Sequence, residues 1–191
     1  MIPDSPPIEI SITPLISGSD FSDWKSLNDT IMGGSSIANC HSSERGLFLE
    51  GNLVEKGGGF VSCRSPVFHE PLNLSNYSGL ILDVEGHGRT LKFAIACEKK
   101  PLSLSNFLKG DVRWVASIPT KKKGVSKVKV PFNTFKPARR ANPVRLPIRF
   151  DSTCINRFQL LYSKFGTPGK MNSEFLAGPI KILIKSISAY S

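Results

Sequence analysis

The sequence has no apolar stretch that approaches the roughly 20 residues of a membrane-spanning helix. Its first residues, MIPDSPP, have neither the basic nor the apolar region of a secretory signal, and they lack the arginines of a transit peptide. We therefore expect a cytoplasmic protein without signal peptide or transmembrane helix, or a mature chain whose targeting segment has been removed.

Motifs that mark common catalytic centres are also missing. There is no G-x-S-x-G elbow and no H-E-x-x-H, and the run Gly57–Gly59 is not followed by the Lys-Ser/Thr of a phosphate-binding loop. A glycosidase needs only two carboxylates, and Asp29, Asp83 and Glu85 are available, but sequence does not show that any pair converges. The expectation is a protein that is not an enzyme and carries no cofactor.

Cysteine is scarce and widely spaced. Four cysteines occur, Cys40, Cys63, Cys97 and Cys154, and none belongs to a C-x-x-C pair. A zinc site usually needs closely spaced pairs of ligands, so no metal is expected. We interpret all four as buried free thiols, which fits a reducing compartment.

Acidic residues are few in one part of the chain. The segment 99–149 has fourteen Lys or Arg and a single acid, Asp111, so its formal charge is +13 within a chain of net +10. Such a segment is either a solvated face or a surface that attracts lipid headgroups, RNA or an acidic protein. Three of its aromatic residues, Trp114, Phe132 and Phe135, are interpreted as core rather than as stacking platforms for bases.

Glycine and proline are plentiful, 16 and 14 of 191 residues, and they separate short apolar runs. This spacing predicts an all-β sandwich or jelly roll. In the last predicted strand the apolar faces before and after Lys185-Ser186 disagree, so a bulge is expected there. The predicted strands are Leu47–Val54, Phe60–Arg64, Leu80–Glu85, Thr90–Cys97, Val112–Ile118, Val125–Val130, Arg157–Tyr162 and Ile180–Ala189.

The domain organisation is simple. Residues 1–19 are expected to form an arm and a first strand, in which Ile8, Ile10 and Ile12 alternate with polar residues. Residues 20–191 are expected to form a single sandwich domain, with 136–149 as its longest loop.

An ordered series of motifs resembles the complex I intermediate-associated protein family. Trp24 is followed by NDTIMGGSS at 28–36, GGFVSCRS at 58–65 and VEGHGR at 84–89. Trp114, then VPF at 130–132 with Phe135, and ISAY at 187–190 complete the series. The resemblance covers about 21–190.

This resemblance implies a jelly-roll sandwich similar to galactose-binding and carbohydrate-binding modules, without a catalytic centre. Family members are assembly factors for respiratory complex I, and related domains in cyanobacteria and plants include one that supports translation of a photosystem subunit. A bare domain resembles the bacterial, especially cyanobacterial, version. The expected function is therefore a chaperone-like assembly factor that binds subunits or intermediates of a membrane bioenergetic complex.

Docking through a basic face would place the protein peripherally on a thylakoid or plasma membrane. The alternatives are an RNA- or ribosome-associated factor and, third, a carbohydrate-binding module, for which the sequence offers few spare aromatics. The candidate partner-binding residues are Asn28, Asp29, Arg64, Arg89, Lys121, Lys122, Lys123, Arg139 and Arg140.

Other residues of the motifs are expected to serve the structure. Trp24 and Trp114 are interpreted as core anchors and Met32 as core filler, and Asn28 and Asp29 are expected to brace their loop as readily as to contact a partner. An arginine after an apolar strand must reach solvent, a carboxylate or a ligand, so Arg64 and Arg89 are candidates to line a concave face. The structural residues are Trp24, Met32, Gly33, Gly34, Gly58, Gly59, Phe60 and Trp114.

Overall fold

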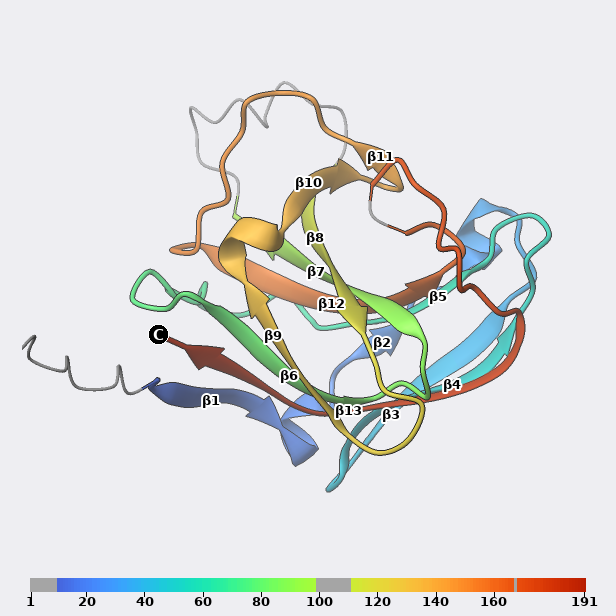
Figure 1. The fold of residues 1–191 in the computed structure, drawn as a ribbon, viewed down its shortest axis with the longest axis horizontal. Coiled ribbons are helices and arrows are strands. Elements are labelled where there is room, and N and C mark those ends of the chain that lie inside the picture. Colours follow the sequence, from blue (N-terminus) through green and yellow to red (C-terminus); the bar gives the residue numbers. More distant parts are fainter. Residues whose placement is uncertain (1–9, 99–110, 167) are drawn as a thin grey trace, which may run out of the picture.

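The chain folds into two antiparallel β-sheets packed face to face (Figure 1). The computed structural model describes residues 10–98, 111–166 and 168–191. Within these residues, sheet A has six strands, with β1 beside one half of β13 and β4 beside the other. Its strands are, across the sheet, β3 (Ile37–Ser43), β4 (Gly46–Leu53), β13 (Gly178–Tyr190), β6 (Gly79–Glu85) and β9 (Ser126–Pro131), with β1 (Ile12–Ser17) on β13.

Sheet B has seven strands in the same described ranges. They are, in order across the sheet, β11 (Asn142–Pro143), β10 (Lys136–Arg139), β8 (Arg113–Pro119), β7 (Thr90–Cys97), β12 (Ile155–Ser163), β5 (Phe60–Arg64) and β2 (Lys25–Ser26). Short 3₁₀ helices connect some strands: η1 (Gly18–Phe21), η2 (Asp29–Met32) and η4 (Phe132–Thr134). None of the helices in the described part of the chain has the length and apolar run that a bilayer crossing requires.

All eight strands that the sequence predicts are present. The bounds of β5 and β7 agree with the prediction, and the other six differ by one or two residues. β2, β3, β10 and β11 were not predicted, and the last two lie in the stretch 136–149 expected as a loop. β3 has the composition IANCHSS, with little β-branched or aromatic content, so it becomes a strand through its pairing with β4.

The long strand β13 confirms the predicted bulge. Its pairing with β6 shifts register between Ile184 and Ser186. The extra residue returns Ile187 to the same buried side as Ile184, and both belong to one apolar core.

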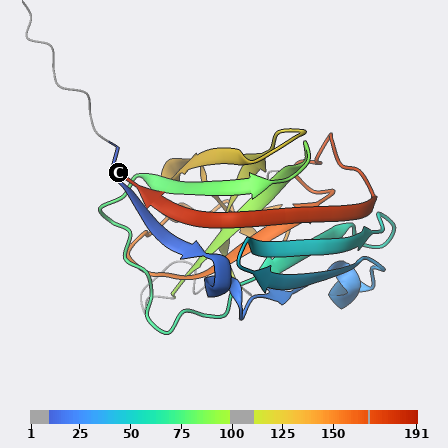
Figure 2. The ribbon, with the colours of Figure 1, turned by 90° about the horizontal axis from the view of Figure 1, so that it is seen from below.

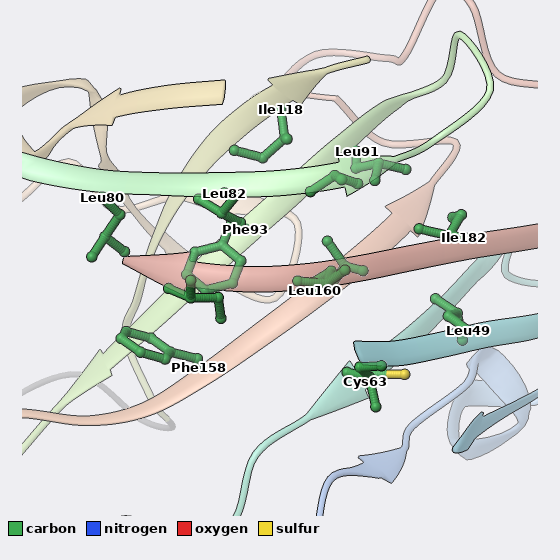
Figure 3. Close-up of a cluster of buried hydrophobic side chains, with 14 of the residues drawn as sticks. Leu49, Cys63, Leu80, Leu82, Leu91, Phe93, Ile118, Phe158, Leu160 and Ile182 are labelled. Atoms are coloured by element: carbon green, nitrogen blue, oxygen red, sulfur yellow. The ribbon is translucent and has the colours of Figure 1, made fainter. Parts of the chain in front are cut away.

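The core lies between the sheets and takes side chains from both (Figure 3). Leu82 and Ile182 of sheet A face Phe93, Phe158 and Leu160 of sheet B, each at most 1% exposed. Trp24 and Trp114 are buried as predicted.

The first strand belongs to the same sandwich. β1 pairs with the C-terminal half of β13 (Figure 2), from Ile12 opposite Tyr190 to Ser17 opposite Ser186. It begins only at Ile12, where the alternation predicted a strand from Ile8, which lies outside the described residues. Ile10 and Ile12 are about half exposed, because they lie at the open end of this pairing.

The interpretation of all four cysteines as free thiols is wrong for two of them. Cys40 of β3 and Cys63 of β5 form a disulfide that joins sheet A to sheet B, with a Cα–Cα separation of 5.8 Å. Sequence spacing gave no sign of this pair, because 23 residues separate the two and only the stacking of the sheets brings them together. Cys97 and Cys154 are not part of a disulfide. The inference of a reducing compartment therefore loses its basis.

Candidate functional site

The segment 28–36, here called the signature loop, is organised around one buried carboxylate. Asp29 is 0% exposed. One of its oxygens accepts from Ser36 Oγ at 2.6 Å and from the Gly59 amide at 2.7 Å, and the other accepts from the Ser36 amide at 2.9 Å. Ser36 Oγ in turn contacts the Val54 carbonyl and amide. The carboxylate thus ties the signature loop to the loop between β4 and β5.

These donors stabilise the charged form of the acid. Burial raises the pKa of the Asp29 carboxyl, but the bonds from Ser36, Gly59 and Phe60 outweigh it, so the pKa lies below its ordinary value. The side chain is ionised at neutral pH and saturated with donors. Asp29, a candidate partner contact, therefore has no exposed surface to present in this structure.

The glycines of the two motifs serve this carboxylate in two ways. A Cβ on Gly34 would lie 2.3 Å from Asp29 Cγ, and one on Gly58 would lie 2.4 Å from Asp29 Cβ, so neither position has room for a side chain. Gly33 has no atom within 4 Å of such a Cβ, but its φ is +84°. Gly33 is thus required for its left-handed backbone, and Gly34 for close approach.

Beside this brace, the signature loop exposes apolar side chains. Ile31 is 64% exposed, Met32 57% and Ile37, the first residue of β3, 66%. The expectation that Met32 is core filler is therefore wrong, because Gly33 turns the chain so that η2 buries Asp29 instead. Asn28 remains half-buried and donates its Nδ2 to the Ala38 carbonyl at 2.8 Å, at the start of the same strand.

Arg64 lies elsewhere, on the face of sheet B that points away from the core, here called the outer face. Its Cα partner on β12 is Gln159, which pairs on its other side with Ala94 of β7. Two residues away on β12, Arg157 pairs with Ala96. Arg113 on β8 completes a group, here called the arginine cluster, of Arg64, Arg113 and Arg157.

Burial and mutual repulsion both act on these arginines. Burial lowers the pKa of Arg113 and so do the charges of Arg64 and Arg157, while Asp111 opposes the shift. Burial, followed by the charge of Arg64, likewise lowers the pKa of Arg157. Arg113 Nη1 donates to Gln159 Oε1, Gln159 Nε2 donates to Ser62 Oγ at 2.8 Å, and Ser62 Oγ donates to the Leu27 carbonyl at 2.6 Å.

A cavity of about 410 Å³ adjoins the arginine cluster. Arg113, Arg157 and Ala96 are among its lining residues, together with apolar residues including Val67, Trp114 and Ile148. Arg149 and the acids Glu98, Asp111 and Asp151 also border it. Its volume is within the range of small-molecule sites, roughly 300–1,000 Å³.

Arg89 does not join Arg64. Its Nη2 donates to the Pro179 carbonyl at 3.2 Å, and its guanidinium lies 5.7 Å from the centre of the buried Tyr162 ring. The two arginines proposed to line one face therefore occupy different parts of the sandwich.

The five candidate basic residues Lys121, Lys122, Lys123, Arg139 and Arg140 form two separate exposed groups. Lys121–Lys123 follow the end of β8, where the Lys121 carbonyl accepts from the Gly88 amide. Arg139 and Arg140 end β10, which pairs with the start of β8. The six residue steps of β8 separate the groups by about 20 Å. The rest of the basic segment, 99–110, lies outside the described residues.

The aromatic residues that the structure describes in the basic segment belong to the core or pack against it. Trp114, Phe132 and Phe135 each lie within 6 Å of the Phe150 ring, centre to centre. Trp114 and Phe135 are buried and Phe132 packs against the core, as the sequence predicts. In the described ranges, every aromatic ring is buried or half-buried.

Sequence reasoning missed Arg113, Arg157 and Gln159. The period-two alternation of β8 and β12 placed them opposite the core residues, but only the strand order shows that they converge on Arg64. Over the described residues, no group of three or more His, Cys, Asp or Glu is arranged to hold a metal ion.

Comparison with known proteins adds a family and a fold. A protein-family model described as Complex I intermediate-associated protein 30 (CIA30) matches residues 15–184. No curated protein matches the sequence. A family 11 carbohydrate-binding module from Clostridium thermocellum, solved in complex with a β-1,3-1,4-mixed-linked tetrasaccharide, has 16% identity and a TM-score of 0.62 over 93% of this chain and 94% of its own.

Two further structures agree. The corresponding module of a cellulosomal cellulase of Clostridium thermocellum has 14% identity and a TM-score of 0.63, with 95% of each chain covered. An agarase has 12% identity and a TM-score of 0.56 over 94% of this chain and 24% of its own. At these identities the likeness concerns the fold, which is a jelly-roll sandwich of the galactose-binding-like type.

Proposed function

Since the chain belongs to the family of Complex I intermediate-associated protein 30, we propose that it is a non-catalytic assembly factor. It binds subunits or partly built intermediates of a membrane bioenergetic complex, either a respiratory or NDH-type complex I or a photosystem. It acts at the periphery of a plasma or thylakoid membrane and leaves when assembly is complete.

The observation that supports this proposal is the apolar surface of the signature loop. Ile31, Met32 and Ile37 are each more than half exposed, although the chain has a large core in which to bury such residues. The Asp29 brace fixes the backbone that carries them, so little conformational entropy is lost when a partner covers them. Exposed apolar side chains on a rigid support are typical of a protein-binding surface.

The size of this surface fits a transient contact. Three side chains and the adjoining edge strand β3, which pairs only with β4 within the described residues, give an interface at the small end of the usual range. A small interface has a fast dissociation rate, which suits a factor that must be released from the finished complex.

The turn Lys121–Lys123 supports membrane association. All three lysines are exposed. Each lysine near an anionic lipid surface contributes about 1 kcal/mol to binding at low to moderate salt.

The test is a pull-down with the tagged chain from gently solubilised cells of its source, with subunits quantified by mass spectrometry. The double variant Ile31→Ser/Met32→Ser should lose at least about tenfold of the captured subunits, since each lost apolar contact costs about 1 kcal/mol or more. Met171→Ser is the matched control, because Met171 is 61% exposed but lies in another loop. Equal loss in both variants, or no loss in either, would contradict the proposal.

The same experiment separates the alternatives. Ribonuclease treatment that removes the captured proteins would favour an RNA- or ribosome-associated factor. Single-strand binding through about five phosphates would then show a log–log salt slope near −3.5. A glycan array with a specific hit would favour a carbohydrate-binding module.

A further inference from the structure

The outer face of sheet B has a positively charged trough over small residues. These are Ala94 and Ala96 of β7, of which Ala94 is 2% exposed and Ala96 lines the cavity, and the register places Arg157 of β12 directly beside Ala96. Arg113 lies on β8, on the other side of β7. Because neighbouring strands are about 4.8 Å apart, the strands that carry Arg113 and Arg157 are about 10 Å apart, and two guanidinium groups can converge on one small ligand over the alanines.

The charges of this trough are unevenly matched. Three guanidinium groups act on one another, and Asp111 is the acid that opposes the pKa shifts of both Arg113 and Arg157. Arg149 and the acids Glu98 and Asp151 also border the adjoining cavity, so four guanidiniums stand against three carboxylates and the excess is about one positive charge. The Nε of Arg157 is buried and has no hydrogen-bond partner among the described residues.

The cluster is also held in position before any ligand arrives. Gln159 is 2% exposed and accepts from Arg113, and Ser62, which is fully buried, anchors Gln159. A guanidinium held by a buried amide presents its remaining donors in a fixed direction. The cavity of about 410 Å³ beside Arg113 and Arg157 has room for a small organic body attached to the anionic group.

We propose that the arginine cluster binds a phosphate monoester. At neutral pH such a group carries nearly two negative charges, which the excess positive charge of the site attracts, and its three oxygens accept from paired N–H donors of arginine. A single carboxylate has two acceptor oxygens rather than three, so it would accept from fewer of the donors of Arg113 and Arg157. The phosphate is held over Ala96 between Arg113 and Arg157, with Arg64 beside it, and the body of the ligand extends into the cavity.

The test uses the whole chain, purified in chloride buffer without phosphate. Binding of glycerol 3-phosphate is measured by calorimetry and by the shift in melting temperature, against sodium chloride at equal ionic strength. We expect a shift with glycerol 3-phosphate alone, and a loss of about 10- to 100-fold in affinity in Arg157→Gln. Arg157→Lys, which keeps the charge but not the paired donors, should lie between the two.

Arg140→Gln is the matched control, since it removes the same charge from an exposed residue at the end of β10. Equal losses in Arg140→Gln and Arg157→Gln, a shift reproduced by sodium chloride, or no binding at all would overturn the proposal. Citrate binding in place of glycerol 3-phosphate would overturn the assignment of a phosphate. Flotation with phosphatidic acid vesicles, lost in Arg157→Gln, would place the same monoester on a lipid.

This site and the proposed function can fail separately. Arg157→Gln should still capture the subunits in the pull-down, and Ile31→Ser/Met32→Ser should still bind glycerol 3-phosphate.

Discussion

The signature loop and the arginine cluster differ in how their charged side chains are compensated by their surroundings. In the signature loop a single buried carboxylate is surrounded by donors from Ser36 and Gly59. In the arginine cluster three cations share one face, and burial and then the neighbouring cations lower the pKa of Arg113 and Arg157. A saturated charge stabilises the fold, whereas an unmatched charge is available to a ligand. Substitutions in the two regions should therefore change stability with opposite signs.

The largest effect is expected from Asp29→Ala. It leaves the Ser36 and Gly59 donors buried without an acceptor, so the free energy of unfolding should fall by about 3–5 kcal/mol. Urea unfolding followed by circular dichroism measures this change. Asp23→Ala, at an exposed residue nearby, should change it by less than about 0.5 kcal/mol. A small loss in Asp29→Ala would show that water replaces the carboxylate.

Alanine substitutions at the adjacent Gly33 and Gly34 should lower the free energy of unfolding by different amounts. In Gly34→Ala the added methyl group overlaps the Asp29 carboxylate, so the free energy of unfolding should fall by about 2–3 kcal/mol. Gly33→Ala has free space and only a strained φ, so it should cost about 1 kcal/mol. The difference in melting temperature between the two variants measures this ranking. The reverse order would refute the distinction between close approach and backbone conformation.

The stability due to Asp29 should depend on pH. Its pKa in the folded state lies below the unfolded value of about 3.9, so the contribution is complete above that value and is lost as the pH falls through the lower folded pKa. Wild type should therefore exceed Asp29→Asn in unfolding free energy at pH 7, and the gap should narrow below about pH 4. A gap independent of pH between 7 and 3 would contradict the ionised brace.

The smallest expected change in stability is a gain. Arg157→Gln removes one of three repelling charges, so the ligand-free protein should gain a few tenths of a kcal/mol, an amount limited by solvent screening of a partly exposed group. The gain should shrink as sodium chloride is added. Thermal unfolding at 20 and 500 mM salt tests this; a loss of stability at low salt would show that Arg157 is held by contacts that outweigh the repulsion.

Much of the fold was predictable because it depends on local patterns. Alternating apolar residues predicted eight strands, and the conflict of faces around Lys185 predicted the bulge in β13. β10 and β11 were missed because their short sequences contain proline and lack an apolar alternation, and they are strands only because β10 pairs with β8 and β11 pairs with β10. The Cys40–Cys63 bond was missed for a similar reason, since it depends on the stacking of two sheets.

The sites were less predictable than the fold. From the sequence, Gly33, Gly34 and Gly58 could be assigned to backbone geometry. The sequence did not show that Gly58 packs against Asp29, because the two residues are 29 positions apart. Arg64 was chosen as a candidate because it is an arginine after an apolar strand. No such pattern marked Arg113 on β8 or Arg157 on β12 as its neighbours. Arg89 follows a similar pattern and is engaged by Pro179 instead. Convergence of side chains depends on strand order, which alternation does not encode.

The shared dependence of Gly34 and Gly58 on Asp29 also constrains how descendants of this sequence can diverge. A lineage that acquires a side chain at either glycine while Asp29 is present loses stability through the clash with this carboxylate, so such changes are disfavoured as long as the acid remains. Once Asp29 has been lost, both glycines and Ser36 are released from selection together. Asp29, Gly34, Ser36 and Gly58 should therefore be inherited or lost as one unit, and mixed combinations should be rare among living relatives.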